Sequence, residues 1–180
     1  MSRVVLITCG LRVGGNTDKL ADSFANGCAD NGTEVVRFDV AMMKLSGCTA
    51  CGRCYSNDMA CVFHDVFNNI AMEIENSDAV VIAAPLYWYA LPAQIKCVID
   101  RFYSFCVGKR PVQGKKLGLI SSCADGSIES FGPLKDMLSM SASVLGWEMV
   151  GDVLVTGLVG KDDVIGTDGC ARAKEFARLF

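Results

Sequence analysis

The sequence predicts a doubly wound α/β fold, in which helices cover both faces of one parallel sheet. Five short runs are predicted as strands, and two of them, residues 3–9 and 79–84, have the continuous hydrophobicity of strands buried on both faces. Segments with apolar residues at helical spacing lie between them, and such alternation favours a parallel sheet. The 180 residues are 51% hydrophobic and 21% charged, so we expect a single domain over residues 1–180 with one buried core.

The ten predicted elements follow one another without a repeat or a linker. In the first helix, Leu20, Phe24 and Cys28 recur at i, i+4 and i+8, with Asn16 or Thr17 as the expected cap and Asn31 next to Gly32 as the stop. The elements are a strand over 3–9, a helix over 16–31, a strand over 34–40, a helix over 65–76, a strand over 79–84, a helix over 92–106, a strand over 117–122, a helix over 133–145, a strand over 149–156 and a helix over 170–179.

Charge and hydropathy exclude several classes of partner. The net charge of -3 and the sequence pI of about 5.1 argue against a nucleic-acid partner, which requires a basic surface. No apolar run is long enough to span a bilayer, and the N-terminal residues lack the features of a signal peptide. We therefore expect a cytoplasmic protein without a membrane partner, whose ten cysteines are thiols, metal ligands or redox groups and not disulfides.

A compact cysteine run, C-x2-C-x2-C-x6-C, stands between the second predicted strand and the next helix. It comprises Cys48, Cys51, Cys54 and Cys61. Soft thiolates at this spacing suit a [4Fe-4S] cluster, although no proline follows the last cysteine as in bacterial ferredoxins. A structural zinc site is disfavoured because it usually takes two C-x2-C pairs separated by a dozen or more residues. The remaining interpretation is a loop of metal-free thiols.

The other six cysteines are scattered along the chain and have no common spacing. We expect most of them to fill space as small apolar side chains; they are Cys9, Cys28, Cys97, Cys106, Cys123 and Cys170.

Ligands of doubly wound folds bind beyond the carboxyl ends of the strands, so the loops at those ends are candidates for the site. After the first strand, Gly10 and Gly15 leave backbone N–H groups free, Arg12 is a bidentate donor, and Asn16 and Thr17 add side-chain donors. The loop matches neither G-x-G-x-x-G nor a Walker A motif, so a terminal monophosphate fits better than a dinucleotide or ATP. The alternative is an ordinary helix start with a surface arginine.

Two further loops follow the third and fourth strands. The first contains the consecutive aromatic residues Tyr87, Trp88 and Tyr89, which cannot all point into one core. At least one should line the crevice, where a flat conjugated ring is a natural ligand, or a subunit interface; otherwise they close the top of the domain. The second loop, residues 121–126, is small and polar, and is either a source of hydrogen bonds to such a ring or a simple turn.

Three stretches together resemble the NAD(P)H-dependent FMN reductases of the flavodoxin-like superfamily. They are Arg12-Val-Gly-Gly-Asn-Thr17, Ala84-Pro-Leu-Tyr-Trp88, and Gln94-Ile-Lys96 with Asp100-Arg101-Phe102. The cysteine run is similar to that of the iron-sulfur flavoprotein branch. The resemblance implies a flavodoxin-like, three-layer, five-stranded sheet of strand order 2-1-3-4-5, and it implies FMN as cofactor with NAD(P)H as electron donor.

The resemblance also assigns residues to the cofactor and to the cluster. The implied FMN-binding residues are Gly10, Arg12, Gly15, Asn16, Thr17, Pro85, Leu86, Tyr87, Trp88, Ser122, Cys123, Asp125 and Gly126, and the implied cluster ligands are Cys48, Cys51, Cys54 and Cys61. No protein side chain is expected to be catalytic, because the flavin carries the chemistry. This chain has Cys9-Gly10-Leu11 where family members usually have Gly-Ser-Pro, which removes one serine hydroxyl from the phosphate site.

The expected function is an FMN-dependent NAD(P)H oxidoreductase that reduces quinones, nitroaromatics or flavins. One alternative is an iron-sulfur flavoprotein in which FMN and a [4Fe-4S] cluster pass electrons to protein partners. A second alternative is a flavodoxin-type electron carrier, which the arginine of the phosphate loop and the mild net charge disfavour. The resemblance implies a homodimer or homotetramer that meets a small-molecule electron acceptor or a redox protein.

Overall fold

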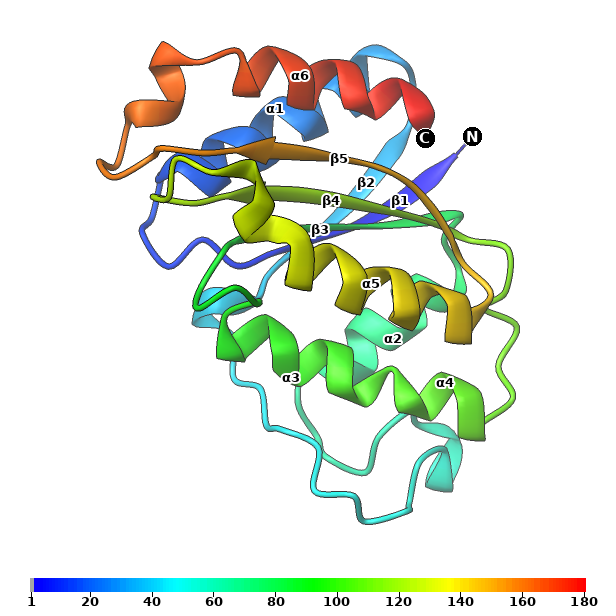
Figure 1. Cartoon of the computed structure of the whole chain (residues 1–180). Helices are drawn as coiled ribbons and strands as arrows, with labels where there is room; N and C mark the ends of the chain where they lie inside the picture. Colours follow the sequence, from blue (N-terminus) through cyan, green and yellow to red (C-terminus); the bar gives the residue numbers. More distant parts are fainter. Residues whose placement is uncertain (1) are drawn as a thin grey trace.

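The computed structural model describes residues 2–180 and contains one five-stranded parallel sheet (Figure 1). The strand order is β2-β1-β3-β4-β5, with each neighbouring pair parallel. The strands are β1 (Arg3–Thr8), β2 (Glu34–Asp39), β3 (Ala79–Pro85), β4 (Lys116–Ser122) and β5 (Glu148–Val155). The predicted fold class and strand order are confirmed.

Helices cover both faces of the sheet, and each face has its own apolar core (Figure 1). On one face, α1 (Asn16–Asp30) and α6 (Gly169–Phe176) pack on alternate residues of the strands, with Phe24 and Phe176 at the centre. On the other face lie α2 (Phe67–Glu75), α3 (Ala93–Arg101), α4 (Tyr103–Val107) and α5 (Gly132–Leu145). None of the described helices has the length and hydropathy to cross a membrane.

One predicted helix is wrong as a single element. The sequence predicts a helix over 92–106, but the structure divides it into α3 and α4 at Phe102, whose N–H bonds the Ile99 carbonyl only three residues back. The Phe102 ring turns into the core, where it packs against Phe105 and Trp147 with centroids 5.6 Å away in both cases. Apolar spacing alone did not reveal the break, because the buried face continues across it.

The other boundaries differ from the prediction by at most two residues, except for the end of the last helix, which differs by three. The C-terminal helix ends at Phe176, and Ala177–Leu179 continues it as a 3₁₀ turn. Because all five strands are parallel, their carboxyl ends meet at one edge of the sheet, and the loops that leave them lie together there.

Candidate functional site

A cleft lies at this edge of the sheet, beside the N-terminus of α1. It encloses about 160 Å³. It brings together ten of the predicted cofactor residues: Gly10, Arg12, Gly15, Asn16, Thr17, Pro85, Leu86, Tyr87, Ser122 and Cys123. Three separate loops therefore supply one site, as the order of the strands requires.

The first turn of α1 begins at this cleft without a side-chain cap. Its N-cap residue is Gly15, whose own N–H donates to the Arg12 carbonyl at 2.7 Å, and no side chain caps the helix. A Cβ on Gly15 would lie 2.7 Å from the same carbonyl oxygen, so only glycine permits this tight approach. The N–H groups of the first turn, which have no intrahelical acceptor, are left for an external anion.

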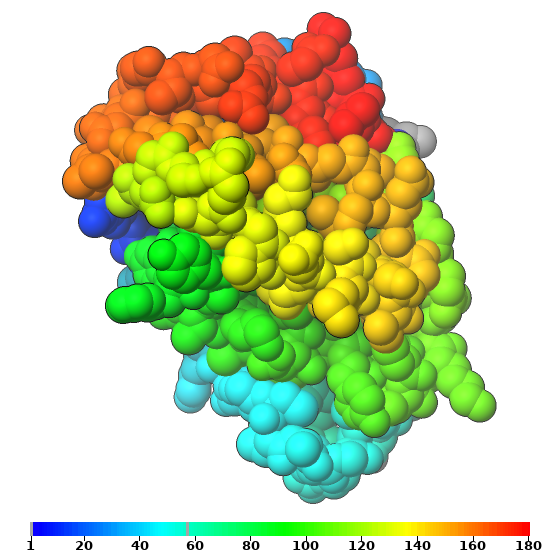
Figure 2. Space-filling model, viewed as in Figure 1, coloured from blue at the N-terminus to red at the C-terminus, as the bar shows by residue number. Residues whose placement is uncertain are grey.

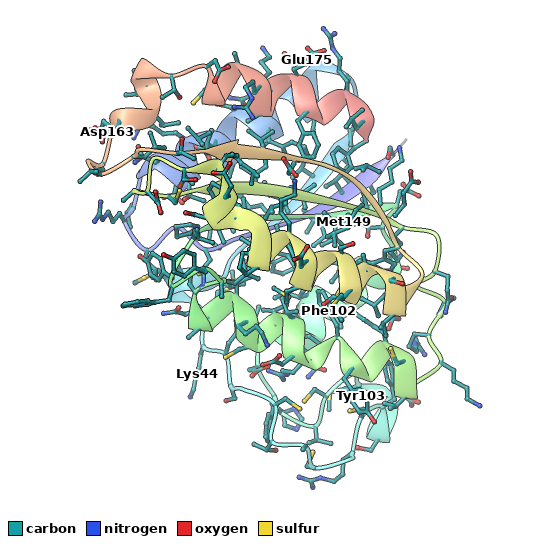
Figure 3. All side chains as sticks on the ribbon, viewed as in Figure 1. Lys44, Phe102, Tyr103, Met149, Asp163 and Glu175 are labelled. Atoms are coloured by element: carbon teal, nitrogen blue, oxygen red, sulfur yellow. The ribbon has the colours of Figure 1, made fainter. Side chains whose placement is uncertain are left out.

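Asn16 does not cap the helix, contrary to prediction, because its side-chain amide binds the loop between β5 and α6. Its Nδ2 donates to the Gly160 carbonyl at 2.6 Å, and its Oδ1 accepts the Val164 N–H at 3.1 Å. Arg12 Nη1 donates to the Val159 carbonyl at 3.1 Å. We call residues 156–168 the β5–α6 loop; it covers the phosphate loop, residues 9–17, and Figure 3 shows its Asp163 at the edge of the molecule.

Thr17 also has a partner other than the helix. Its Oγ1 lies 3.0 Å from Ser122 Oγ at the end of β4, and both residues are buried. The expected cap is absent at Thr17 as at Asn16, and this hydroxyl pair instead links the start of α1 to β4.

Asp18 explains the glycine at position 10. A Cβ added to Gly10 would lie 1.9 Å from Asp18 Oδ1, so a serine here would overlap the carboxylate. The other oxygen, Oδ2, accepts the Gly14 N–H at 2.8 Å. Burial raises the pKa of Asp18, and the Gly14 N–H partly offsets that effect. This carboxylate orders the backbone of the loop but supplies no donor in place of the missing serine hydroxyl.

The aromatic loop after β3 forms a tight turn whose tip is exposed. Tyr87 and Ala90 exchange two backbone hydrogen bonds, at 2.9 and 3.0 Å. The two residues between them, Trp88 and Tyr89, have positive φ angles of 48° and 62°, which non-glycine residues seldom adopt. Trp88 is 94% exposed and lies outside the cleft. With Asp125 it lines an adjoining hollow that shares Leu86 and Cys123 with the cleft.

Some cleft residues were missed from the sequence, and one predicted residue lies apart. Gly126 lines neither the cleft nor the hollow. The residues not predicted are Leu11, Ala124, Leu158 and Val159. Leu158 and Val159 follow β5. Because all five strands are parallel, the loop after β5 could have been expected at the same edge of the sheet.

The cysteine loop, residues 47–64, forms a second cavity elsewhere on the molecule. The cavity encloses about 460 Å³, and all four cysteines of the run line it together with residues of α3 and α4. All four are free thiols. Partial burial raises the pKa of Cys54, and the neighbouring Cys61, Cys48 and Cys51 raise it further. Across residues 2–180, however, no three His, Cys, Asp or Glu side chains are arranged as a metal-binding group.

A buried ion pair closes both ends of the cysteine loop. Arg101 donates to both carboxylate oxygens of Asp65, at 2.7 and 2.9 Å, and to the Ser46 carbonyl at 3.1 Å. The Ser46 N–H donates to the same carboxylate. Burial raises the pKa of Asp65, but the bonds from Arg101 and Ser46 outweigh it and lower that pKa overall. The loop is therefore anchored to α3 before its first cysteine and after its last.

The two cavities have no lining residue in common. Figure 2 shows the cysteine loop, in cyan, at one end of the molecule and the β5–α6 loop, in orange, toward the other. The chain thus has two separate candidate sites.

A family comparison decides the class of the protein. Residues 2–155 match the family model described as NADPH-dependent FMN reductase. The chain belongs to the NADPH-dependent FMN reductase family. Membership of that family implies FMN as the cofactor of this domain.

Curated relatives of this FMN reductase family member carry the name iron-sulfur flavoprotein. One from Archaeoglobus fulgidus is 34% identical over 104 residues, which cover 58% of this chain and 46% of the relative. Another, from Methanosarcina thermophila, is 30% identical over 90 residues, 50% of this chain and 47% of the relative. The matched part therefore spans about half the length of these relatives.

Solved structures of other reductases share the fold. An azoreductase from Bacillus anthracis has a TM-score of 0.74 at 17% identity, with full coverage of both chains. An NAD(P)H:quinone oxidoreductase from Methanothermobacter marburgensis has a TM-score of 0.77 at 17% identity, covering 99% of this chain and 96% of that chain. At 17% sequence identity these similarities are evidence of a shared fold alone.

Proposed function

We propose that residues 1–180 form one FMN-binding domain of an NAD(P)H oxidoreductase that reduces quinones, nitroaromatics or flavins. The observation that carries this proposal is the uncapped N-terminus of α1, which opens into the cleft with Arg12 beside it. Backbone N–H groups, the helix dipole and a guanidinium together suit a terminal phosphate. The donor set of the cleft therefore fits FMN.

Each part of the cleft has a role in holding the cofactor. The N–H groups of the first turn of α1, Arg12 and Asn16 would hold the phosphate, and Pro85, Leu86 and Tyr87 would lie along the ribityl chain and ring. Ser122 and Cys123 would lie at the ring edge, with Trp88 and Asp125 in the adjoining hollow. FMN, when bound, accepts hydride from the nicotinamide and passes electrons to the acceptor. The protein groups orient it and shield one side of the ring from water.

The cleft is smaller than the roughly 300–1,000 Å³ typical of cofactor pockets. Its narrowness has a local cause: Arg12 and Asn16 reach across it to carbonyl groups of the β5–α6 loop. A phosphate is a stronger acceptor for a guanidinium than a carbonyl oxygen. Binding of FMN thus exchanges the Arg12 bond to Val159 for a bond to the phosphate.

The resemblance to FMN reductases favours a second copy of the chain as a partner, and exposed apolar side chains are available to it. Val13, Trp88 and Val159 come from three different loops and are 78%, 94% and 69% exposed. A homodimer or homotetramer would cover them and the outer face of the flavin.

The phosphate provides the test, because riboflavin lacks it. We expect the protein to bind FMN more tightly than riboflavin, and Arg12→Met to weaken FMN binding by about tenfold or more without changing riboflavin binding, since a hydrogen bond to a charged group contributes about 1.5–3 kcal/mol. Arg178→Met, at an exposed site remote from the cleft, is the matched control. A protein that retains no added FMN, or that oxidises no NAD(P)H with any small acceptor, contradicts the proposal.

A second candidate function adds an iron-sulfur cluster to the same chain. Four free thiols line one cavity, and soft thiolates are the ligands that such clusters take. The four thiols are the donor set of a [4Fe-4S] cluster, whose ligands would be Cys48, Cys51, Cys54 and Cys61. The loop would have to bring their sulfur atoms closer together to hold it. The cluster would let FMN pass electrons singly to a protein partner.

Anaerobic purification distinguishes the two candidates. Flavin, iron and acid-labile sulfide should all be present if the cluster forms, and Cys54→Ala should remove the iron while FMN remains. Cys106→Ala, at an exposed cysteine outside the run, is the control and should change neither. Flavin without iron or sulfide would leave the first function and exclude the second.

A further inference from the structure

Two buried polar side chains of the cysteine cavity have no hydrogen-bond partner. They are Arg101, through Nε, and Ser104, through Oγ, and these residues are 3% and 2% exposed. Both line the cavity with the four cysteines. A buried polar atom without a partner costs roughly 1–3 kcal/mol and is rare in native proteins. Among the described residues only Arg3 and Glu73 share this condition, and those two face each other in an ion pair.

Ser104 differs from two other partly buried helical serines of this chain. Ser23 and Ser141 each donate their hydroxyl to the carbonyl four residues earlier, at 2.8 Å in both cases. Ser104 makes no such bond, although it stands in α4 just after the break at Phe102. Figure 3 shows the adjacent Tyr103 on the side of the cysteine loop and Phe102 nearer the sheet. The hydroxyl of Ser104 thus stays available at the wall of the cavity.

Arg101 is held so that Nε is its one nitrogen without a hydrogen-bond partner. Its two terminal nitrogens bind Asp65 and Ser46, and its guanidinium stacks 4.4 Å from the centroid of the Phe67 ring. The thiol of Cys61 lies next to this guanidinium. The Arg101 guanidinium is therefore a fixed cation at the edge of the cavity that the four cysteines line.

We propose that Ser104 Oγ–H and Arg101 Nε–H donate hydrogen bonds to sulfur atoms of the iron-sulfur cluster, so that both are positioning residues of the redox centre. This inference rests on the second candidate function. Hydrogen bonds to sulfur stabilise the more negative, reduced state, because they spread its added charge onto the donors, and they raise the reduction potential. Neither donor atom has a hydrogen-bond partner within the chain, so each is available to a cluster sulfur.

A potential measurement tests this on the anaerobically purified, iron-containing protein. Ser104→Ala should retain iron, sulfide and FMN, while the midpoint potential of the cluster, followed by electron paramagnetic resonance during titration with dithionite, shifts to a more negative value. Ser104→Thr keeps the hydroxyl and should stay near the wild-type potential. Ser141→Ala, whose hydroxyl binds the Met137 carbonyl, is the control and should not shift it.

The outcomes separate this inference from the function on which it rests. Wild-type protein without iron or sulfide overturns the cluster itself. A wild-type cluster whose potential is the same in Ser104→Ala as in Ser141→Ala overturns the role of Ser104 and leaves the cluster in place. Arg101→Lys keeps a cation opposite Asp65 but removes Nε; retention of the wild-type potential in that folded variant would overturn the role of Arg101.

Discussion

Arg101 and Asp65 form a bidentate ion pair that is buried at the base of the cysteine loop, with side chains only 2% and 7% exposed. Charges held in this way are stable only as a pair, because either one alone would be left desolvated without a partner. The pair joins residues that are 36 positions apart and fixes the loop on α3.

Removal of one member of this pair should destabilise the fold strongly. We expect Asp65→Asn to lower the free energy of unfolding by about 3 kcal/mol, since it leaves the Arg101 charge buried. Urea denaturation measures the change. The control is Asp100→Asn on α3, the helix that carries Arg101. The exposed Lys96–Asp100 pair should contribute about 0.5 kcal/mol or less. Equal effects of the two substitutions would contradict the buried role.

The same pair predicts how stability depends on pH. The folded protein lowers the pKa of Asp65 below its ordinary value of 3.8, so the stabilisation is complete above that pH and is lost as the pH falls through the folded pKa. The difference in Tm between wild type and Asp65→Asn should therefore be constant from pH 7 to 5 and shrink below pH 4. A difference that persists unchanged at pH 3 would assign the stabilisation to other contacts.

Substitutions of Asn16 should separate stability from cofactor binding. Asn16→Ala loses both bonds to the β5–α6 loop, at a cost of about 1–2 kcal/mol, whereas Asn16→Asp keeps an acceptor for the Val164 N–H. The aspartate, however, places a negative charge beside the phosphate. We expect Asn16→Asp to be the more stable variant in urea and the weaker FMN binder by fluorescence titration. The same ranking in both measurements would disprove a phosphate contact at this residue.

The aromatic turn should tolerate glycine better than a branched residue. Trp88 has φ 48° and is almost fully exposed, so Trp88→Gly removes strain and little packing, and should change stability by less than about 1 kcal/mol. Trp88→Val should lower stability, because branching at Cβ disfavours this conformation. If Trp88 contacts the ring or the acceptor, Trp88→Gly should also raise the KM for a quinone. An unchanged KM would place Trp88 outside the site.

Burial should protect two of the scattered cysteines from alkylation. Burial raises the pKa of Cys9 and of Cys28 to about 11, and the reactive thiolate is correspondingly rare at neutral pH. Iodoacetamide should modify the exposed Cys106 within the folded protein and reach Cys9 and Cys28 only after unfolding, as peptide mass spectrometry can show. Labelling of Cys9 at the rate of Cys106 would contradict the buried packing.

β1 and β3 were predictable because they are buried along almost their whole length and have no polar residue in their interior. The expected strand over 117–122 differs from β4 by one residue, and the convergence of Arg12 and Tyr87 followed from the strand order alone. What the sequence did not reveal depends on pairings across long separations. Asn16 binds residues more than 140 positions away, and the Asp65–Arg101 pair has no periodic signal. The break at Phe102 was hidden because an unbroken apolar face covers it.

The β5–α6 loop begins just beyond residue 155, where the match to the family model ends, yet it supplies the partners of Arg12 and Asn16. The cleft therefore includes residues that lie beyond the segment matched by the family model. A chain shortened to the shared part would keep five strands and lose the lining that Leu158 and Val159 give to the cleft. Substitutions in this loop can therefore alter the contacts of Arg12 and Asn16 without changing either residue.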